Sequence, residues 1–136
     1  STRKTAAALA VALGLCLLWG NLLLKPLIGR IRPFNVQDAI TLLITAPLDY
    51  SFPSGHTMSS FAAAMVLLLT DRRMGIPAML LAGLIAFSRM YLYVHYPTDV
   101  LAGLLMGCLF GWLAVRIVQK LHARRFQRNQ QEKPHS

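Results

Sequence analysis

The sequence is poor in charge, and in negative charge above all. Of 136 residues, 14% are charged, and 14 Lys and Arg stand against five Asp and Glu, so the formal net charge is +9. Soluble domains carry roughly 25% charged residues, whereas 55% of this chain is hydrophobic. The composition argues against a soluble globular domain. It also argues against intrinsic disorder, which requires few apolar residues.

Cysteine is scarce as well, and the chain does not begin with Met. Its two cysteines, Cys16 and Cys108, each lie inside an apolar run, which indicates buried thiols rather than a disulfide framework. The cations are few and stand at the ends of apolar runs, so the positive charge does not indicate a nucleic-acid partner. The missing Met favours a mature form or a fragment.

Long apolar runs dominate what is present. Four stretches contain no Asp, Glu, Lys or Arg: residues 5–24, 50–70, 74–88 and 100–115. A membrane-spanning helix needs about 20 mostly apolar residues, and flanking Arg side chains can lengthen a short run by snorkelling. We therefore predict spans over residues 5–24, 54–71, 74–91 and 98–119. The predicted fold is all-α, a polytopic transmembrane helix bundle with four spans.

The remaining segments do not span. Residues 39–48 form a ten-residue apolar run that we expect to be interfacial or re-entrant. We assign residues 1–122 to one transmembrane domain and residues 123–136 to a mobile, basic cytoplasmic tail. In the last span, Gly103, Gly107 and Gly111 recur every four residues, which favours close helix packing within the chain over packing between protomers. A homo-oligomer stays open.

The distribution of cations predicts the orientation, because Lys and Arg accumulate in cytoplasmic loops. With alternating spans, one side receives Arg3, Lys4, Arg72, Arg73, Arg116, Lys120, Arg124, Arg125, Arg128 and Lys133. The other side receives Lys25, Arg30, Arg32 and Arg89. We expect a plasma or inner membrane protein, with both ends of this chain in the cytoplasm. The four outer cations go against the trend and need a reason.

Three polar clusters fall on that outer side. They are residues 25–33 (KPLIGRIRP), residues 53–56 (PSGH), and Ser88 and Arg89 followed by His95 and Asp99. Lys25, Arg32 and Arg89 supply positive charge, and Arg matches phosphate oxygens with a planar donor fork. Ser54 and the amides of Gly55 and His56 stand at a helix N-terminus, which favours anions. The combination suits a tetrahedral dianion.

Two histidines accompany these cations. His95 and Asp99 are four residues apart, so the carboxylate can hold one ring nitrogen and leave the other free to attack. His56 can then protonate the leaving oxygen. Because Asp99 is the only acidic residue within these clusters, we expect no metal and no cofactor.

The ordered pattern Lys25-x₆-Arg32-Pro33, PSGH ending at His56, and Ser88-Arg89-x₅-His95-x₃-Asp99 resembles the signature of the type 2 phosphatidic acid phosphatase (PAP2) superfamily. The resemblance covers residues 25–107 directly. It implies a metal-independent lipid phosphatase in which His95 forms a phosphohistidine, Asp99 orients it and His56 is the general acid. It also implies a set of phosphate-binding residues, namely Lys25, Arg32, Ser54, Gly55, Ser88 and Arg89.

The expected substrate is a lipid phosphate or diphosphate presented at the outer leaflet, with undecaprenyl diphosphate as the first choice. Phosphatidic acid and phosphatidylglycerophosphate are rivals. A vanadium haloperoxidase-like enzyme and a non-enzymatic subunit that binds anionic lipid are alternatives from other classes. Two features depart from the family: bacterial members usually have six spans, so we expect two more upstream, and Tyr93 stands where relatives often have a small residue.

Overall fold

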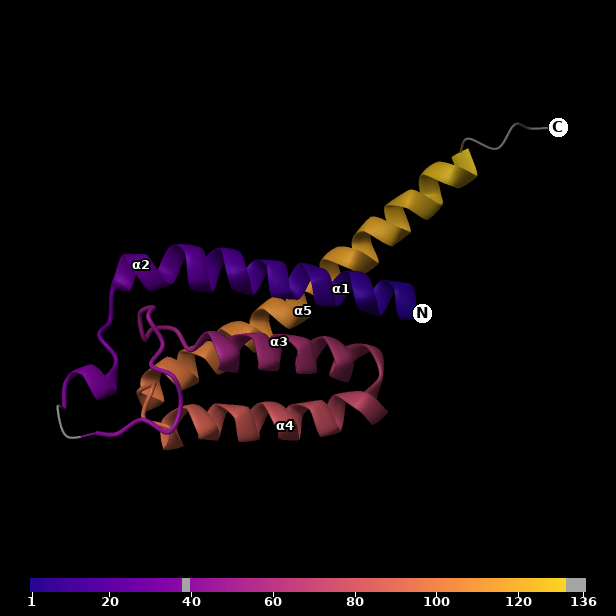
Figure 1. Cartoon of the computed structure of the whole chain (residues 1–136). Helices are drawn as coiled ribbons and strands as arrows, with labels where there is room; N and C mark the ends of the chain where they lie inside the picture. Colours follow the sequence, from indigo (N-terminus) through magenta and orange to yellow (C-terminus); the bar gives the residue numbers. More distant parts are fainter. Residues whose placement is uncertain (38–39, 132–136) are drawn as a thin grey trace.

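The computed structural model describes residues 1–37 and 40–131 and contains helices but no strand within those ranges (Figure 1). The elements follow in the order α1 (Thr2–Leu15), η1 (Cys16–Leu24), α2 (Lys25–Ile28), η2 (Pro33–Asn35), α3 (Gly55–Thr70), α4 (Arg72–Tyr91) and α5 (Pro97–Gln131). The predicted all-α class is confirmed.

The first predicted span is one continuous rod. The wider π-helical turns of η1 carry the backbone from α1 into α2 without a break, since the residues between them keep helical dihedral angles. The rod ends at Gly29, whose φ of 58° lies in the left-handed region that favours glycine. This turn sends Arg30 and Arg32 back toward the bundle.

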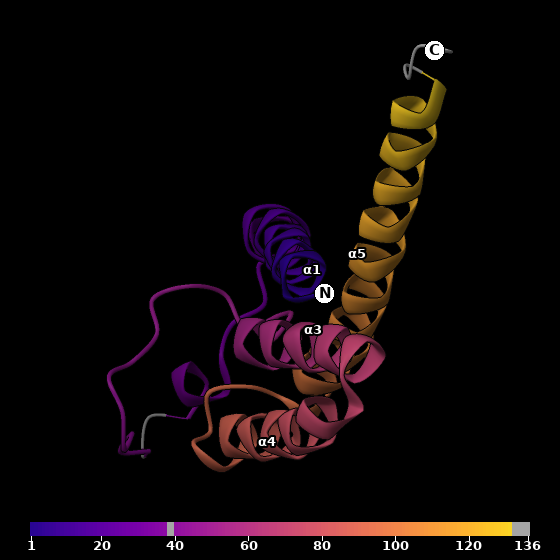
Figure 2. The same cartoon turned by 90° about the vertical axis from the view of Figure 1, so that its right-hand side faces the viewer.

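Helix α3 occupies the centre. It contacts α1, α4 and α5, and Figure 2 shows it between α1 and α4 with α5 alongside. Its buried side chains Met58, Ala62 and Val66 pack with Ala12 of α1 and Ala114 of α5. At the far end of α3, the carboxylate of Asp71 accepts a hydrogen bond of 3.0 Å from the amide of Arg73 and begins α4.

The glycines of α5 form the contact with α3. A methyl group at Gly103 would lie 2.7 Å from the carbonyl oxygen of Ser54, and one at Gly111 would lie 2.6 Å from that of Ala62. At Gly107 it would collide with the carbonyl oxygen of Met58. The two backbones therefore meet directly, which confirms the prediction that this glycine repeat packs within the chain.

Three helices, Thr2–Asn35, Arg72–Tyr91 and Pro97–Gln131, are long and apolar enough to cross a membrane. The remaining predicted span, residues 54–71, corresponds to α3, which has only 16 residues. A helix enclosed by other helices does not have to match the bilayer thickness, because protein covers its ends. The outward faces carry exposed large apolar side chains, among them Leu18, Leu22, Leu84 and Leu105, as expected for contact with lipid.

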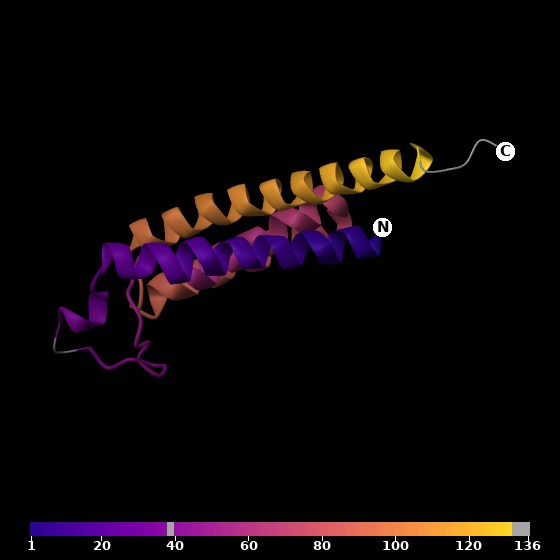
Figure 3. The same ribbon diagram turned by 90° about the horizontal axis from the view of Figure 1, so that it is seen from above.

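Two predicted non-spanning segments differ in outcome. Residues 40–54 form a loop without helix or strand, and this loop contains residues 40–48 of the expected interfacial run. Ala39, the first residue of that run, lies outside the described residues. The expected tail continues α5 as an exposed helix as far as Gln131, while residues 132–136 lie outside the described part. The N-terminus and the described end of α5 both lie at the end of the bundle opposite this loop (Figures 1 and 3).

Candidate active site

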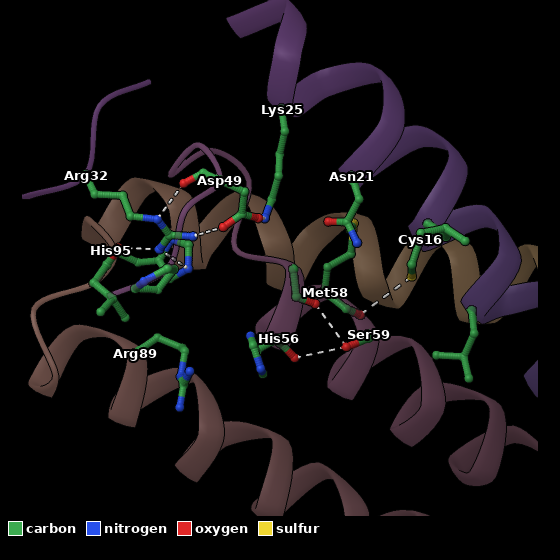
Figure 4. A pocket seen from close by; sticks show the side chains of 15 residues that line it. Cys16, Asn21, Lys25, Arg32, Asp49, His56, Met58, Ser59, Arg89 and His95 are labelled. Carbon is green, nitrogen blue, oxygen red and sulfur yellow. Dashed lines mark hydrogen bonds and ion pairs between the residues drawn. The ribbon is translucent and has the colours of Figure 1, made fainter. Parts of the chain in front are cut away.

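The three polar clusters meet at one end of the bundle. The chain leaves α2, enters α3, leaves α4 and enters α5 at this end (Figure 1). A pocket of about 310 Å³ lies there. Of the predicted site residues, it is lined by Lys25, Arg32, Gly55, His56, Arg89 and His95. Figure 4 shows the side chains of Lys25, Arg32, His56, Arg89 and His95 gathered there from different helices and from the segments between them.

The guanidinium of Arg32 is buried and held on several sides. Its Nη1 donates to the carbonyl oxygen of Val94 at 2.8 Å, and its Nε donates to the carbonyl oxygen of Asp49 at 2.8 Å. The same Nη1 lies 3.2 Å from Nε2 of His95 (Figure 4). Arg32 thus joins the turn after α4 to the loop before α3 and touches the proposed nucleophile.

This contact assigns the tautomer of His95. A guanidinium only donates, so Nε2 accepts through its one lone pair, which is directed at Arg32, and the neutral ring carries its proton on Nδ1. Nδ1 is buried without a hydrogen-bond partner and lies 3.6 Å from Oδ2 of Asp99. That separation exceeds a hydrogen bond, so a shift of the imidazole toward Asp99 would complete it.

Asp99 is fully buried behind the pocket and is anchored by groups that sequence reasoning did not assign to it. Its carboxylate accepts from the hydroxyl of Ser51 at 2.5 Å and from the amide of Tyr96 at 2.9 Å. It also forms an ion pair of 2.8 Å with Arg30. The carboxylate is therefore held in place independently of His95.

Arg30 is one of the four cations that the sequence places on the outer side, and its side chain has partners of its own. Its guanidinium pairs with Asp99, donates to Thr98 at 2.6 Å and stacks 4.2 Å from the ring centre of Tyr96. Arg30 does not line the pocket. Nothing in the sequence linked residues 30 and 99, which lie 69 positions apart.

The start of α3 forms the floor of the pocket. Gly55 begins the helix, and a methyl group there would lie 3.0 Å from Oδ1 of Asn21 and 3.8 Å from Nζ of Lys25. Glycine therefore keeps the amide end of the helix open between these two side chains. His56 follows and lines the same pocket as His95.

The two predicted serine ligands are turned away from the pocket. Ser54 is fully buried, and its hydroxyl lies 2.9 Å from that of Thr57. The Ser88 hydroxyl donates to the carbonyl oxygen of Ile85 at 2.7 Å and accepts from Arg89 at 3.4 Å. Neither lines the pocket. Arg89 does, and among the described residues it forms no ion pair with a carboxylate.

Asp49, left without a role by the sequence, also lines the pocket. Its carboxylate forms ion pairs with Lys25 and, at 2.6 Å, with Arg32 (Figure 4). Partial burial disfavours its charge, but the hydrogen bonds and positive charges of these two cations prevail and hold the pKa of Asp49 below its ordinary value. Asp99 is thus not the only acidic residue at this end.

Tyr93 lies in the turn after α4 with a φ of 57°, a left-handed conformation that costs a residue with a side chain about 1–3 kcal/mol. Glycine, which has no Cβ, would adopt this conformation without the strain. The hydroxyl of Tyr93 donates to Oε1 of Gln37 at 3.0 Å, outside the pocket lining.

Comparison with known proteins places this geometry in a family. The model of the PAP2 superfamily matches residues 4–123. The chain belongs to the PAP2 superfamily. This match confirms the family membership that the sequence motifs predict.

Curated PAP2-like relatives include two lipid phosphatases of different substrate. An undecaprenyl-diphosphatase of Sulfolobus acidocaldarius is 38% identical over 117 residues, covering 85% of this chain and 56% of the relative. A lipid A 4'-phosphatase of Bacteroides thetaiotaomicron is 35% identical over 132 residues, covering 89% of this chain and 59% of the relative. The chain therefore spans little more than half the length of these proteins.

Solved structures share the fold. LpxE of Aquifex aeolicus superposes with a TM-score of 0.75 at 31% identity, over 84% of this chain and 68% of that one. A transmembrane PAP2-type phosphatidylglycerolphosphate phosphatase from Bacillus subtilis gives a TM-score of 0.67 at 29% identity, over 82% and 58%. These membrane proteins support assignment of this PAP2 chain to a multi-pass membrane bundle.

Proposed function

We propose that this chain carries the catalytic site of a lipid phosphatase that cleaves a phosphate monoester or diphosphate through a phosphohistidine. One observation carries the proposal: His56 and His95 line a single pocket together with Lys25, Arg32 and Arg89. Two imidazoles and three cations around one space provide a nucleophile, a proton donor and charge compensation for a transferring phosphoryl group.

The reaction begins at Nε2 of His95. When a substrate phosphate oxygen takes over the hydrogen bond from Nη1 of Arg32, the lone pair of Nε2 becomes free. The lone pair then attacks phosphorus, a nitrogen–phosphorus bond forms, and the bond from phosphorus to the leaving oxygen breaks. His56 gives its proton to that oxygen. Water then attacks the phosphohistidine, His56 takes a proton from the water, and inorganic phosphate leaves with Nε2 restored.

Asp99 supports the nucleophile during both steps. As positive charge develops on the imidazole of His95, attraction draws Nδ1 toward the carboxylate 3.6 Å away. Ser51 and Arg30 keep that carboxylate stationary while the ring moves. Lys25, Arg32 and Arg89, with the amide end of α3, neutralise the phosphoryl oxygens.

Undecaprenyl diphosphate is the substrate we favour, because a long apolar tail can stay in the bilayer while the diphosphate enters the cationic pocket. A relative named undecaprenyl-diphosphatase supports this choice. Relatives named for lipid A and phosphatidylglycerolphosphate keep other lipid phosphates as the second candidate.

The decisive experiment measures phosphate release from purified lipid phosphates and diphosphates in detergent. We expect turnover that persists in EDTA, is blocked by vanadate and falls by at least about 10³-fold in His95→Ala. Asp71→Asn is the matched control, since it lies at the opposite end and Asn also caps helices. Unchanged turnover in His95→Ala would contradict the mechanism, and bromination with added vanadate but without phosphatase activity would favour a haloperoxidase.

We also propose that the pocket faces outward and the termini face the cytoplasm, as the distribution of cations predicts. Leu48 is fully exposed beside the pocket, and Gln127 is exposed near the other end. In intact cells, Leu48→Cys should react with an impermeant thiol reagent and Gln127→Cys should not. The reverse pattern would invert the orientation.

A further inference from the structure

An acidic side chain occupies the cationic pocket of this chain. The carboxylate of Asp49 is paired with both Lys25 and Arg32, two of the three cations that would receive a phosphate group (Figure 4). A carboxylate carries one negative charge on two oxygens and can stand in for two phosphate oxygens. Substrate that binds these cations must compete with Asp49.

Arg32 does not need this carboxylate for its position. The carbonyl oxygens of Val94 and of Asp49 itself hold its Nη1 and Nε at 2.8 Å, and these contacts survive any change of the Asp49 side chain. Only Nη2 donates to the carboxylate. Loss of the negative charge would therefore free one donor edge of Arg32 without releasing the guanidinium.

The burial of the three groups is unequal, and this makes Asp49 the partner that can leave. The side chains of Lys25 and Arg32 are 9% and 4% exposed, whereas that of Asp49 is 54% exposed. Asp49 also stands in a loop without helix or strand. Its carboxylate can move into water while the two cations stay in the pocket.

We propose that Asp49 is a specificity-determining residue, an internal competitor that yields Lys25 and Arg32 to a doubly charged terminal phosphate but not to a singly charged phosphodiester. The inference rests on the proposed phosphatase function and deepens it. A membrane surface presents phosphodiester headgroups in large excess over any monoester or diphosphate substrate. A bare cationic pocket at that surface would be occupied by them.

The difference in charge provides the discrimination. A phosphodiester carries one negative charge, so exchanging it for the carboxylate of Asp49 adds no net attraction to the cations. A monoester carries between 1.5 and 2 negative charges near pH 7, as known for phosphorylated side chains, and a terminal diphosphate is also multiply charged. Only these anions gain Coulomb energy when they displace Asp49.

The test compares the binding of two anions to the purified chain in detergent by calorimetric titration at pH 8. Inorganic phosphate represents the doubly charged group, and dimethyl phosphate represents the diester. Asp49→Asn keeps the shape and removes the charge. We expect its affinity for dimethyl phosphate to rise about two- to fivefold, the range for an ion pair with a half-exposed partner, and the preference for phosphate to fall.

Two further variants complete the design. Asp49→Glu retains the charge and should keep most of the preference for phosphate, while Asp71→Asn should leave both affinities unchanged. Thermal unfolding of each variant verifies that it is folded. The same titration with His95→Ala shows anion binding without turnover.

The outcomes are distinguishable. If Asp49→Asn lowers the affinity for both anions, Asp49 positions the cations and the inference is wrong. If the ratio of the two affinities does not change while phosphate release by the unaltered chain persists, the inference fails and the proposed function stands. If the unaltered chain neither binds phosphate nor releases it from lipid, both fail.

Discussion

The middle of the bundle is held by close packing, whereas the pocket end contains polar groups that lack hydrogen-bond or ion-pair partners. In the middle, α3 and α5 meet backbone to backbone over Gly103, Gly107 and Gly111, surrounded by buried apolar side chains. At the pocket end, polar groups lack partners: the buried Nδ1 of His95 has no hydrogen bond, and the half-buried Arg89 has no ion pair among the described residues.

This contrast separates stability from function. Close packing leaves no room for an additional atom, so the middle tolerates little change. Polar groups whose partners are missing or too distant are poised to bind something else, and their cost is met by the packed middle. Substitutions in one region should therefore affect folding, and substitutions in the other should affect turnover.

Among substitutions that leave both histidines in place, Arg89→Gln should reduce turnover most. Arg89 lines the pocket and, within residues 1–37 and 40–131, has no carboxylate partner to leave unpaired. Removing one charged donor from a transition state costs about 10²–10³-fold in kcat, so phosphate release should fall by that factor. The temperature of unfolding in detergent should stay unchanged. A large drop in that temperature would mean that Arg89 serves the fold.

Gly107→Ala, in contrast, should lower the stability of the fold. The new methyl group would collide with the carbonyl oxygen of Met58, and overpacking of this kind costs about 1–3 kcal/mol of unfolding free energy. Gly83→Ala is the control on α4, where a methyl group meets nothing within 4 Å. It should stabilise the helix by about 0.4–1 kcal/mol. Thermal unfolding of both variants decides whether the two helices touch as described.

Ser51→Ala should show how far turnover depends on the hydrogen bond that Ser51 donates to Asp99. Ser51 does not line the pocket, but it donates to Asp99, so its loss loosens the carboxylate behind His95. One hydrogen bond to a charged group corresponds to about 1.5–3 kcal/mol, and we expect kcat to fall about tenfold or more with KM unchanged. Thr70→Val, which removes a hydroxyl at the far end, should leave kcat as it is. A rise in KM alone would contradict the positioning role.

The smallest expected effect is the pH dependence of stability from Asp49. Its pKa is lowered in the folded chain, so its ion pairs stabilise the fold above the ordinary carboxyl pKa, and this contribution disappears as the pH falls through the lowered value. Because the side chain is half exposed, the contribution should not exceed about 1 kcal/mol. The difference in unfolding temperature between the unaltered chain and Asp49→Asn should close below about pH 4. A difference that is constant from pH 3 to 7 would refute it.

Much of the architecture could be predicted from the sequence. Apolar runs are local, so the ends of the predicted spans lie within two residues of the ends of helical elements in the structure. The exceptions are the start of α1 and the end of α5, where the helix extends into polar residues. The histidines and cations of the pocket were recognisable because they belong to short motifs near helix ends, whereas Asp49 belongs to none. The order of spans then required those motifs to lie at one end of the bundle.

The sequence by itself determined the helices, their membrane character and the collection of histidines and cations at one end, because these follow from hydrophobicity and chain direction. Only the tertiary structure decided which groups face the pocket. It turned Ser54 and Ser88 away, paired Arg30 with Asp99 and placed Asp49 on Lys25 and Arg32. Such contacts join residues up to 69 positions apart through irregular loops. No local periodicity encodes them, since they depend on how the helices pack.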